Sequence, residues 1–368
     1  MKASPRDITT GAIAPKLLAL AGVALLAALP TAQAFAAEIP LPTVSVGAGL
    51  RSSFTHTSVD GASQDPNDFT LNSARLYLGG VVNDYIKFTM NTEYDSSDSK
   101  VQVIDAIARF EFSPEVNIWA GRFLPPSDRA NLNGPYYSNE WGFATEGVQD
   151  GFPFFAAGRD NGVAYWGDFD KLKVSAGVFD VPATTGKNKT VSAARVQYDF
   201  WDAEPGYYLN GTYYGDKNIL ALGASTQMVS GDKAYTVDGI MEKKIAGGGV
   251  VTASGEYAKY DGFGGYGIPT PPGFSKSNGF FGEGAYLFPT AVGVGKLQGK
   301  FQVLGKYAST SYDTVGPDAK LKTTEVDVNY IIKAFNARLS LFYIDSNFNS
   351  AAGAPDSQQV GLGLQIQI

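Results

Sequence analysis

The chain has 368 residues, a net charge of −7 at neutral pH, no cysteine and one histidine, His56. This composition excludes thiolate catalysis and cysteine-based metal sites, and one imidazole is too few for a histidine metal centre. An acidic chain is also a poor match for nucleic acid or anionic lipid headgroups, so we expect no nucleic-acid partner, metal or cofactor.

The N-terminal 36 residues carry the features of a secretory signal peptide. A basic start is followed by the apolar run 17–29, which is too short to cross a bilayer as a helix. Small residues then predict cleavage after Ala34 or Ala36, which leaves 37–368 as one domain. The alternative is that the run is retained as an anchor.

The segments that follow alternate apolar and polar residues. Between Tyr85 and Asp95, Ile86 and Phe88 alternate with the polar residues Lys87 and Thr89. Successive side chains of a strand point to opposite faces, so such segments have one apolar face and one charged face. An export signal with repeated two-faced strands predicts an all-β fold, a transmembrane antiparallel β-barrel with outer-membrane lipid outside and water inside. A soluble sandwich or repeat solenoid is the alternative, and the heavily charged inner faces argue against it.

Seventeen segments show strand character, and bacterial single-chain barrels have even strand numbers. They are 43–54, 69–82, 84–95, 101–112, 115–123, 160–169, 172–181, 190–200, 206–214, 218–229, 233–245, 249–261, 277–288, 296–309, 320–333, 336–346 and 357–368. The alternation of short and long connections fails between 205 and 261. One of the two candidates 206–214 and 218–229 therefore belongs to a loop, or two segments merge. We predict sixteen strands, with eighteen as the alternative.

The longest connection, 125–158, is rich in aromatic residues and charges. Such aromatic content argues against disorder, and loops of this length are usually functional. By our count it is the third loop on the long-loop side, so we expect it to fold inward and constrict the pore through Asp128, Arg129, Glu140 and Asp150. A loop that packs as an external lid or on a neighbouring subunit is the alternative.

Charged residues on the predicted inner face should line the pore, because a charge facing lipid costs about 2–4 kcal/mol at mid-depth. The wall candidates are Lys87, Asp105, Arg109, Arg195 and Lys300. Their expected role is electrostatic screening of solutes, although many such charges simply pair with each other across strands. The acidic balance of the chain favours cations.

Three motifs, in order, resemble the phosphate-selective porin O and P family. They are Asp105-Ala106-Ile107-Ala108-Arg109, then Gly121-Arg122-Phe123-Leu124-Pro125-Pro126, then Gly158-Arg159-Asp160-Asn161-Gly162-Val163. The resemblance implies a sixteen-stranded, trimeric diffusion channel of the bacterial outer membrane. It does not imply phosphate selectivity, because Arg and Lys do not cluster at one level. The chain also ends on the aliphatic Ile368, where such barrels usually end on an aromatic residue.

These observations predict a non-enzymatic porin for passive diffusion of small hydrophilic solutes or ions. One rival is a structural barrel, a sheath or scaffold for a partner protein. Another is a hydrolase that uses His56, but the chain contains no G-x-S-x-G or H-E-x-x-H element.

Overall fold

The computed structural model describes residues 43–95, 99–142, 158–180, 190–229, 231–261, 276–313 and 316–368. The chain divides into two units, Met1–Leu41 and Pro42–Ile368, and all described residues belong to the second. The predicted signal peptide, its cleavage site and the alternative of an anchor lie outside the described residues. Asp150 and the rest of 143–157 also lie outside them.

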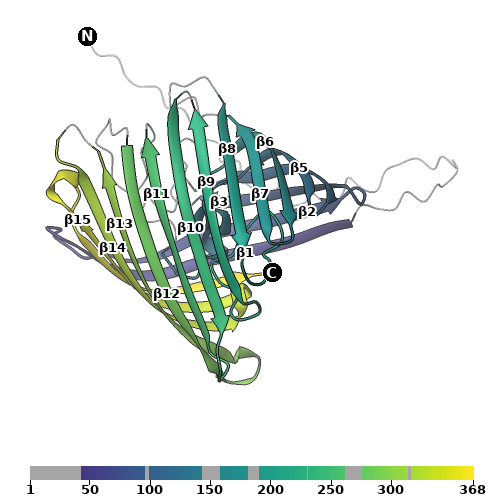
Figure 1. Ribbon diagram of the computed structural model, residues 1–368. Coiled ribbons are helices and arrows are strands. Elements are labelled where there is room, and N and C mark those ends of the chain that lie inside the picture. Colours follow the sequence, from purple (N-terminus) through teal and green to yellow (C-terminus); the bar gives the residue numbers. More distant parts are fainter. Residues whose placement is uncertain are drawn as a thin grey trace, which may run out of the picture. The chain divides into compact units, whose positions relative to one another are not determined.

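The described residues form sixteen strands that close into one antiparallel barrel, with β1 hydrogen-bonded to both β2 and β16 (Figure 1). This confirms the prediction of sixteen strands. The strands are β1 (Thr43–Val59), β2 (Asn67–Val81), β3 (Ile86–Asp95), β4 (Lys100–Ser113), β5 (Val116–Phe123), β6 (Asp160–Phe169), β7 (Leu172–Phe179), β8 (Val191–Asp199), β9 (Ile219–Val229), β10 (Asp232–Lys244), β11 (Val250–Asp261), β12 (Lys276–Val292), β13 (Gly299–Tyr312), β14 (Ala319–Lys333), β15 (Ala337–Phe348) and β16 (Ser357–Gln367).

The segment 206–214 is not a strand, so that one of the seventeen predictions is wrong. It lies in the connection between β8 and β9, and its removal restores the even count. Gly206 and Gly215 have φ values of 95° and 86°, a conformation that favours glycine and ends extended structure on both sides. The other sixteen segments each correspond to one strand.

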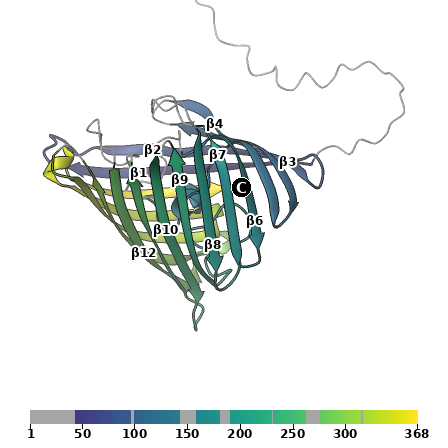
Figure 2. The same ribbon diagram turned by 45° about the horizontal axis from the view of Figure 1, so that its top comes forward.

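The barrel wall has the two faces that the alternation predicts. In β14, Glu325, Asp327 and Asn329 are fully buried, whereas Val326 and Val328 are largely exposed. Buried carboxylates and exposed valines are the reverse of a soluble protein's arrangement. They fit a wall with an apolar outer face and a polar inner face. Both views show the strands side by side around a ring (Figure 2).

Connections from odd to even strands all lie at one rim of the barrel, and those from even to odd strands lie at the other. The connection between β5 and β6 therefore leaves from the opposite rim to the connection between β8 and β9. These two long connections shape the interior.

Within the residues that the structure describes, the short helices lie in connections. They are α1 (Arg129–Tyr137) and the 3₁₀ turns η3 (Gly295–Leu297), η4 (Ala334–Asn336) and η5 (Ser350–Ala352). Asp128 caps α1 by accepting the Asn131 N–H at 2.7 Å, and Gly134, at φ 63°, breaks its helical geometry. Within the described residues, no helix combines the length and hydrophobicity needed to cross a membrane.

Candidate functional site

The described start of the β5–β6 connection, residues 127–142, contacts the inner face of the wall on several sides. We call it the first inner segment. Ser73 Oγ of β2 lies 2.9 Å from Tyr136 Oη, and the Trp141 N–H donates to Asp327 of β14 at 2.8 Å. The Arg129 N–H donates to Asp238 of β10 at 3.2 Å. Since β2, β10 and β14 are far apart in the strand order, the segment spans the interior.

Buried charges hold the C-terminal end of this segment against the wall. Lys306 Nζ of β13 lies 3.0 Å from Glu140 Oε1, and both side chains are buried. Arg338 of β15 donates to the Asn139 carbonyl at 2.8 Å, and Arg51 of β1 donates to the Trp141 carbonyl at 2.8 Å. Breaking a buried pair by removing one partner costs about 3–5 kcal/mol, so these contacts fix the segment firmly.

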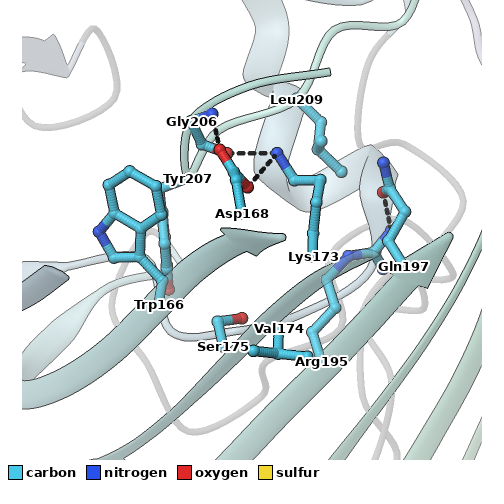
Figure 3. A pocket seen from close by; sticks show the side chains of 10 residues that line it. All are labelled: Trp166, Asp168, Lys173, Val174, Ser175, Arg195, Gln197, Gly206, Tyr207 and Leu209. Carbon is cyan, nitrogen blue, oxygen red and sulfur yellow. Dashed lines mark hydrogen bonds and ion pairs between the residues drawn. The ribbon is translucent and has the colours of Figure 1, made fainter. Parts of the chain in front are cut away.

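The β8–β9 connection, residues 200–218, also contacts the inner face, and we call it the second inner segment. Lys173 of β7 donates to the Glu204 carbonyl. It also donates to the Gly206 carbonyl, and Asp168 of β6 accepts the Gly206 N–H at 2.7 Å (Figure 3). Tyr207 and Leu209 are buried. Asp168 and Lys173 therefore both hold the second inner segment against the wall at Glu204 and Gly206.

The two inner segments meet inside the barrel. Arg129 Nη1 donates to Glu204 Oε1 at 2.9 Å, and the Gly211 N–H donates to the Tyr137 carbonyl at 2.8 Å. The Tyr207 hydroxyl donates to the Leu124 carbonyl at 2.8 Å. Together they form a single body within the lumen, built from both rims.

Burial acts differently on two carboxyl groups of this body. It raises the pKa of Asp128 to about 8, and the hydrogen bond from the Asn131 N–H only partly opposes it. Burial also raises the pKa of Glu204, but the Arg129 guanidinium outweighs it and holds that pKa below its usual value. Burial therefore favours the neutral form of Asp128, while the Arg129 guanidinium favours the ionised form of Glu204.

A cavity of about 390 Å³ remains between the two inner segments and the wall of β2, β3 and β4. We call it the chamber. Its lining includes Arg75, Tyr77, Asn91 and Asp105 from the wall, Arg159 from the start of β6, Tyr137 from the first inner segment and Tyr208 from the second. It is far larger than two other cavities beside the inner segments, each of about 20 Å³.

Charges in and below the chamber are paired. Arg75 pairs with Glu93, and Arg159 Nε lies 2.8 Å from Asp105 Oδ1. Below them, Glu111 lies 2.8 Å from Lys87 Nζ and 2.6 Å from Arg109 Nη2. Four cations and three carboxylates thus line this side of the wall in close to electrical balance.

The predicted wall residues fall in three different places. Lys87, Asp105 and Arg109 lie on the chamber side of the wall. Arg195 is buried beneath the first inner segment, where its Nη2 donates to Asp238 at 2.8 Å. Lys300 lies beside the short turn before β13 and is partly exposed.

Three of the four predicted loop residues anchor the first inner segment. Asp128 caps α1, Arg129 pairs with Glu204 and Glu140 pairs with Lys306, and all three are buried. Sequence reasoning missed Glu204 and Tyr208, because the tyrosine-rich stretch after Gly206 has strand-like composition. The odd strand count and the glycines at 206, 211 and 215 were the available signal.

His56 lies on the exposed side of β1, and its Nδ1 is 3.1 Å from Asn67 Oδ1. No hydrogen bond joins it to a serine within the described residues. The same part of the chain holds no group of three His, Asp or Glu side chains placed to share a metal ion.

No family model matches this chain, and no curated protein matches it. Solved structures do. OmpF of Salmonella typhi, in a complex with daunomycin, has TM-score 0.58 and 14% identity over 88% of this chain and 97% of that chain. OprB of Pseudomonas putida has TM-score 0.58 and 9% identity over 88% and 94%. The trimer form of OmpT, an outer membrane protein of Vibrio cholerae, has TM-score 0.54 and 12% identity over 89% and 99%.

At these identities the likeness shows the fold alone, a closed sixteen-stranded antiparallel β-barrel similar to those of OmpF and OprB. The finer resemblance to the phosphate-selective porin O and P family has no family model behind it and stays a prediction.

Proposed function

We propose that the protein is a passive diffusion channel for small hydrophilic solutes or ions, narrowed by the connection 125–158. The observation that carries this proposal is the chamber. A body anchored across the lumen leaves a polar cavity of about 390 Å³ along β2, β3 and β4. A water-filled barrel with a charged, narrowed interior selects solutes by size and charge.

The second inner segment also takes part in the proposed narrowing of the lumen. Both inner segments narrow the lumen together, because Arg129 of the first and Glu204 of the second link them. Solutes would then pass beside this body, along the paired charges of β2, β3 and β4, and not along the barrel axis.

We further propose a homotrimer in the bacterial outer membrane. The trimer form of a protein with the same fold supports this assembly, as does the motif resemblance. Size measurement of the detergent-solubilised protein by light scattering tests it, and a monomer would contradict it.

Single-channel recording of the purified protein in planar bilayers tests the channel itself. Discrete, ohmic current steps are the expected result. The structural alternative, a sheath for a partner protein, predicts no current from the purified chain and a partner that copurifies with it.

A further inference from the structure

Two tyrosine rings, one on each inner segment, remain exposed at the chamber. Tyr137 of the first inner segment is 41% exposed and Tyr208 of the second is 38% exposed, and both line the chamber. Leaving aromatic surface in water forgoes roughly 25 cal/mol per Å² of burial. The neighbouring rings of Tyr136 and Tyr207 are buried, so only one ring of each adjacent pair of tyrosines lines the chamber.

Two polar atoms without partners lie behind the chamber's surface. Within the described part of the chain, neither Tyr77 Oη nor Asn133 Oδ1 has a hydrogen-bond partner, and both atoms are buried. Both residues line the chamber. Neither atom is accessible from the chamber, so a ligand there would hydrogen-bond instead to the side-chain amides of Asn91 and Asn210, which also line it.

The chamber's charges do not favour a free anion. Arg75 already pairs with Glu93, and Arg159 pairs with Asp105, which also accepts the Asn91 amide at 2.8 Å. A mobile anion would have to displace the Glu93 and Asp105 carboxylates from these two arginines. A neutral hydroxyl can instead bond to the remaining donors and acceptors of each pair without breaking it.

We propose that the chamber binds a neutral saccharide of one or two rings during passage, and this rests on the proposed channel function. A pyranose has a flat C–H face, which packs on a tyrosine ring, and a rim of hydroxyls that both donate and accept. Tyr137 and Tyr208 supply the ring faces, while Asn91 and Asn210 supply side-chain amides for the sugar hydroxyls. A volume of about 390 Å³ is within the range of small-molecule sites.

The test is block of single-channel current by maltose, with sodium phosphate and L-phenylalanine as competing probes. The expected result is concentration-dependent interruption of the current by maltose and weaker interruption by the other two. Tyr208→Ala should weaken the maltose block about tenfold, equivalent to one aromatic contact, and Tyr208→Phe should largely retain it. Asn210→Ala removes one of the amides that line the chamber and should weaken the block several-fold.

Tyr235→Ala is the matched control, because Tyr235 is a 44% exposed tyrosine on the outer face of β10. It should leave the maltose block unchanged. Current steps with no effect of maltose, or a stronger block by phosphate or phenylalanine, would overturn the saccharide proposal and leave the channel intact. Absence of any current would instead overturn the channel function on which it rests.

Discussion

Arg129 and Glu204 form a buried pair between two segments that enter the barrel from opposite rims, with Nη1 and Oε1 at 2.9 Å. Gln197 of β8 also donates to Glu204 at 2.8 Å, which ties the pair to the wall. This ion pair therefore adds a buried charge–charge link to the hydrogen bonds that join the two inner segments.

Replacing Glu204 with Gln leaves the Arg129 charge buried without its partner. We expect docking of the second inner segment to weaken by about 3–5 kcal/mol, because an uncompensated buried charge is costly. Single-channel recordings should show a larger and noisier conductance. Glu115→Gln, on an exposed turn residue, is the control and should match the wild type.

The double variant Arg129→Met with Glu204→Gln should recover part of the wild-type behaviour, since it removes both charges. Equal effects of the single and double variants would show that the pair does not couple the two segments.

The raised pKa of Asp128 predicts a pH dependence. The docked segment holds this proton up to about pH 8, whereas an undocked Asp128 would lose it near its ordinary pKa of 3.8. The protonated Asp128 carboxyl therefore stabilises the docked segment fully below pH 4. This stabilisation declines as the pH rises toward 8, and above pH 8 the stability no longer changes with pH. Transient increases in conductance should become more frequent between pH 5 and pH 8.

Asp128→Asn should abolish this dependence, because asparagine mimics the neutral carboxyl and still caps α1. An unchanged pH profile in that variant would assign the dependence to other groups, such as Asp238 and Glu256 nearby.

Gly363 of β16 lies directly under the Trp141 ring, and a Cβ at this position would be 2.5 Å from it. Gly363→Ala should therefore displace Trp141 and destabilise the first inner segment by about 1–3 kcal/mol, the usual cost of overpacking. Faster cleavage of the folded barrel by an added protease within 127–142 would report this change. Gly284→Ala, where nothing lies within 4 Å of the new Cβ, should leave the cleavage rate as in the wild type.

The paired charges of the chamber predict weak ion selectivity. Reversal potentials in a KCl gradient should lie close to zero, despite the acidic balance of the whole chain. Arg75→Gln leaves Glu93 without its cation and should shift the reversal potential toward that of a cation-selective pore. A strongly selective wild-type channel, of either sign, would show that unpaired charges outside the chamber control permeation.

The barrel wall could be predicted from the sequence because lipid imposes a period of two on every strand. The alternation of Val326 and Val328 with Glu325 and Asp327 gives β14 its faces and its length almost unaided. The interior could be predicted only in part. Asp128, Arg129 and Glu140 stand out as charges in a long loop, but their partners are distant in sequence and no local pattern identifies them.

The second inner segment shows why composition alone misleads. Its residues Tyr207, Tyr208, Tyr213 and Tyr214 suit a strand as well as they suit a packed loop. Its tertiary partners, such as Leu124 and Glu242, make it a packed loop, and only the folded barrel brings these partners within reach.

The most direct test of a hydrated path along β3 uses the absence of cysteine from the chain. Asn91 lines the chamber, whereas its neighbour Met90 belongs to the outer face of the same strand. In planar bilayers, a water-soluble, charged methanethiosulfonate reagent should lower the current of Asn91→Cys and leave that of Met90→Cys unchanged. Modification of Met90→Cys with an inert Asn91→Cys would contradict the account.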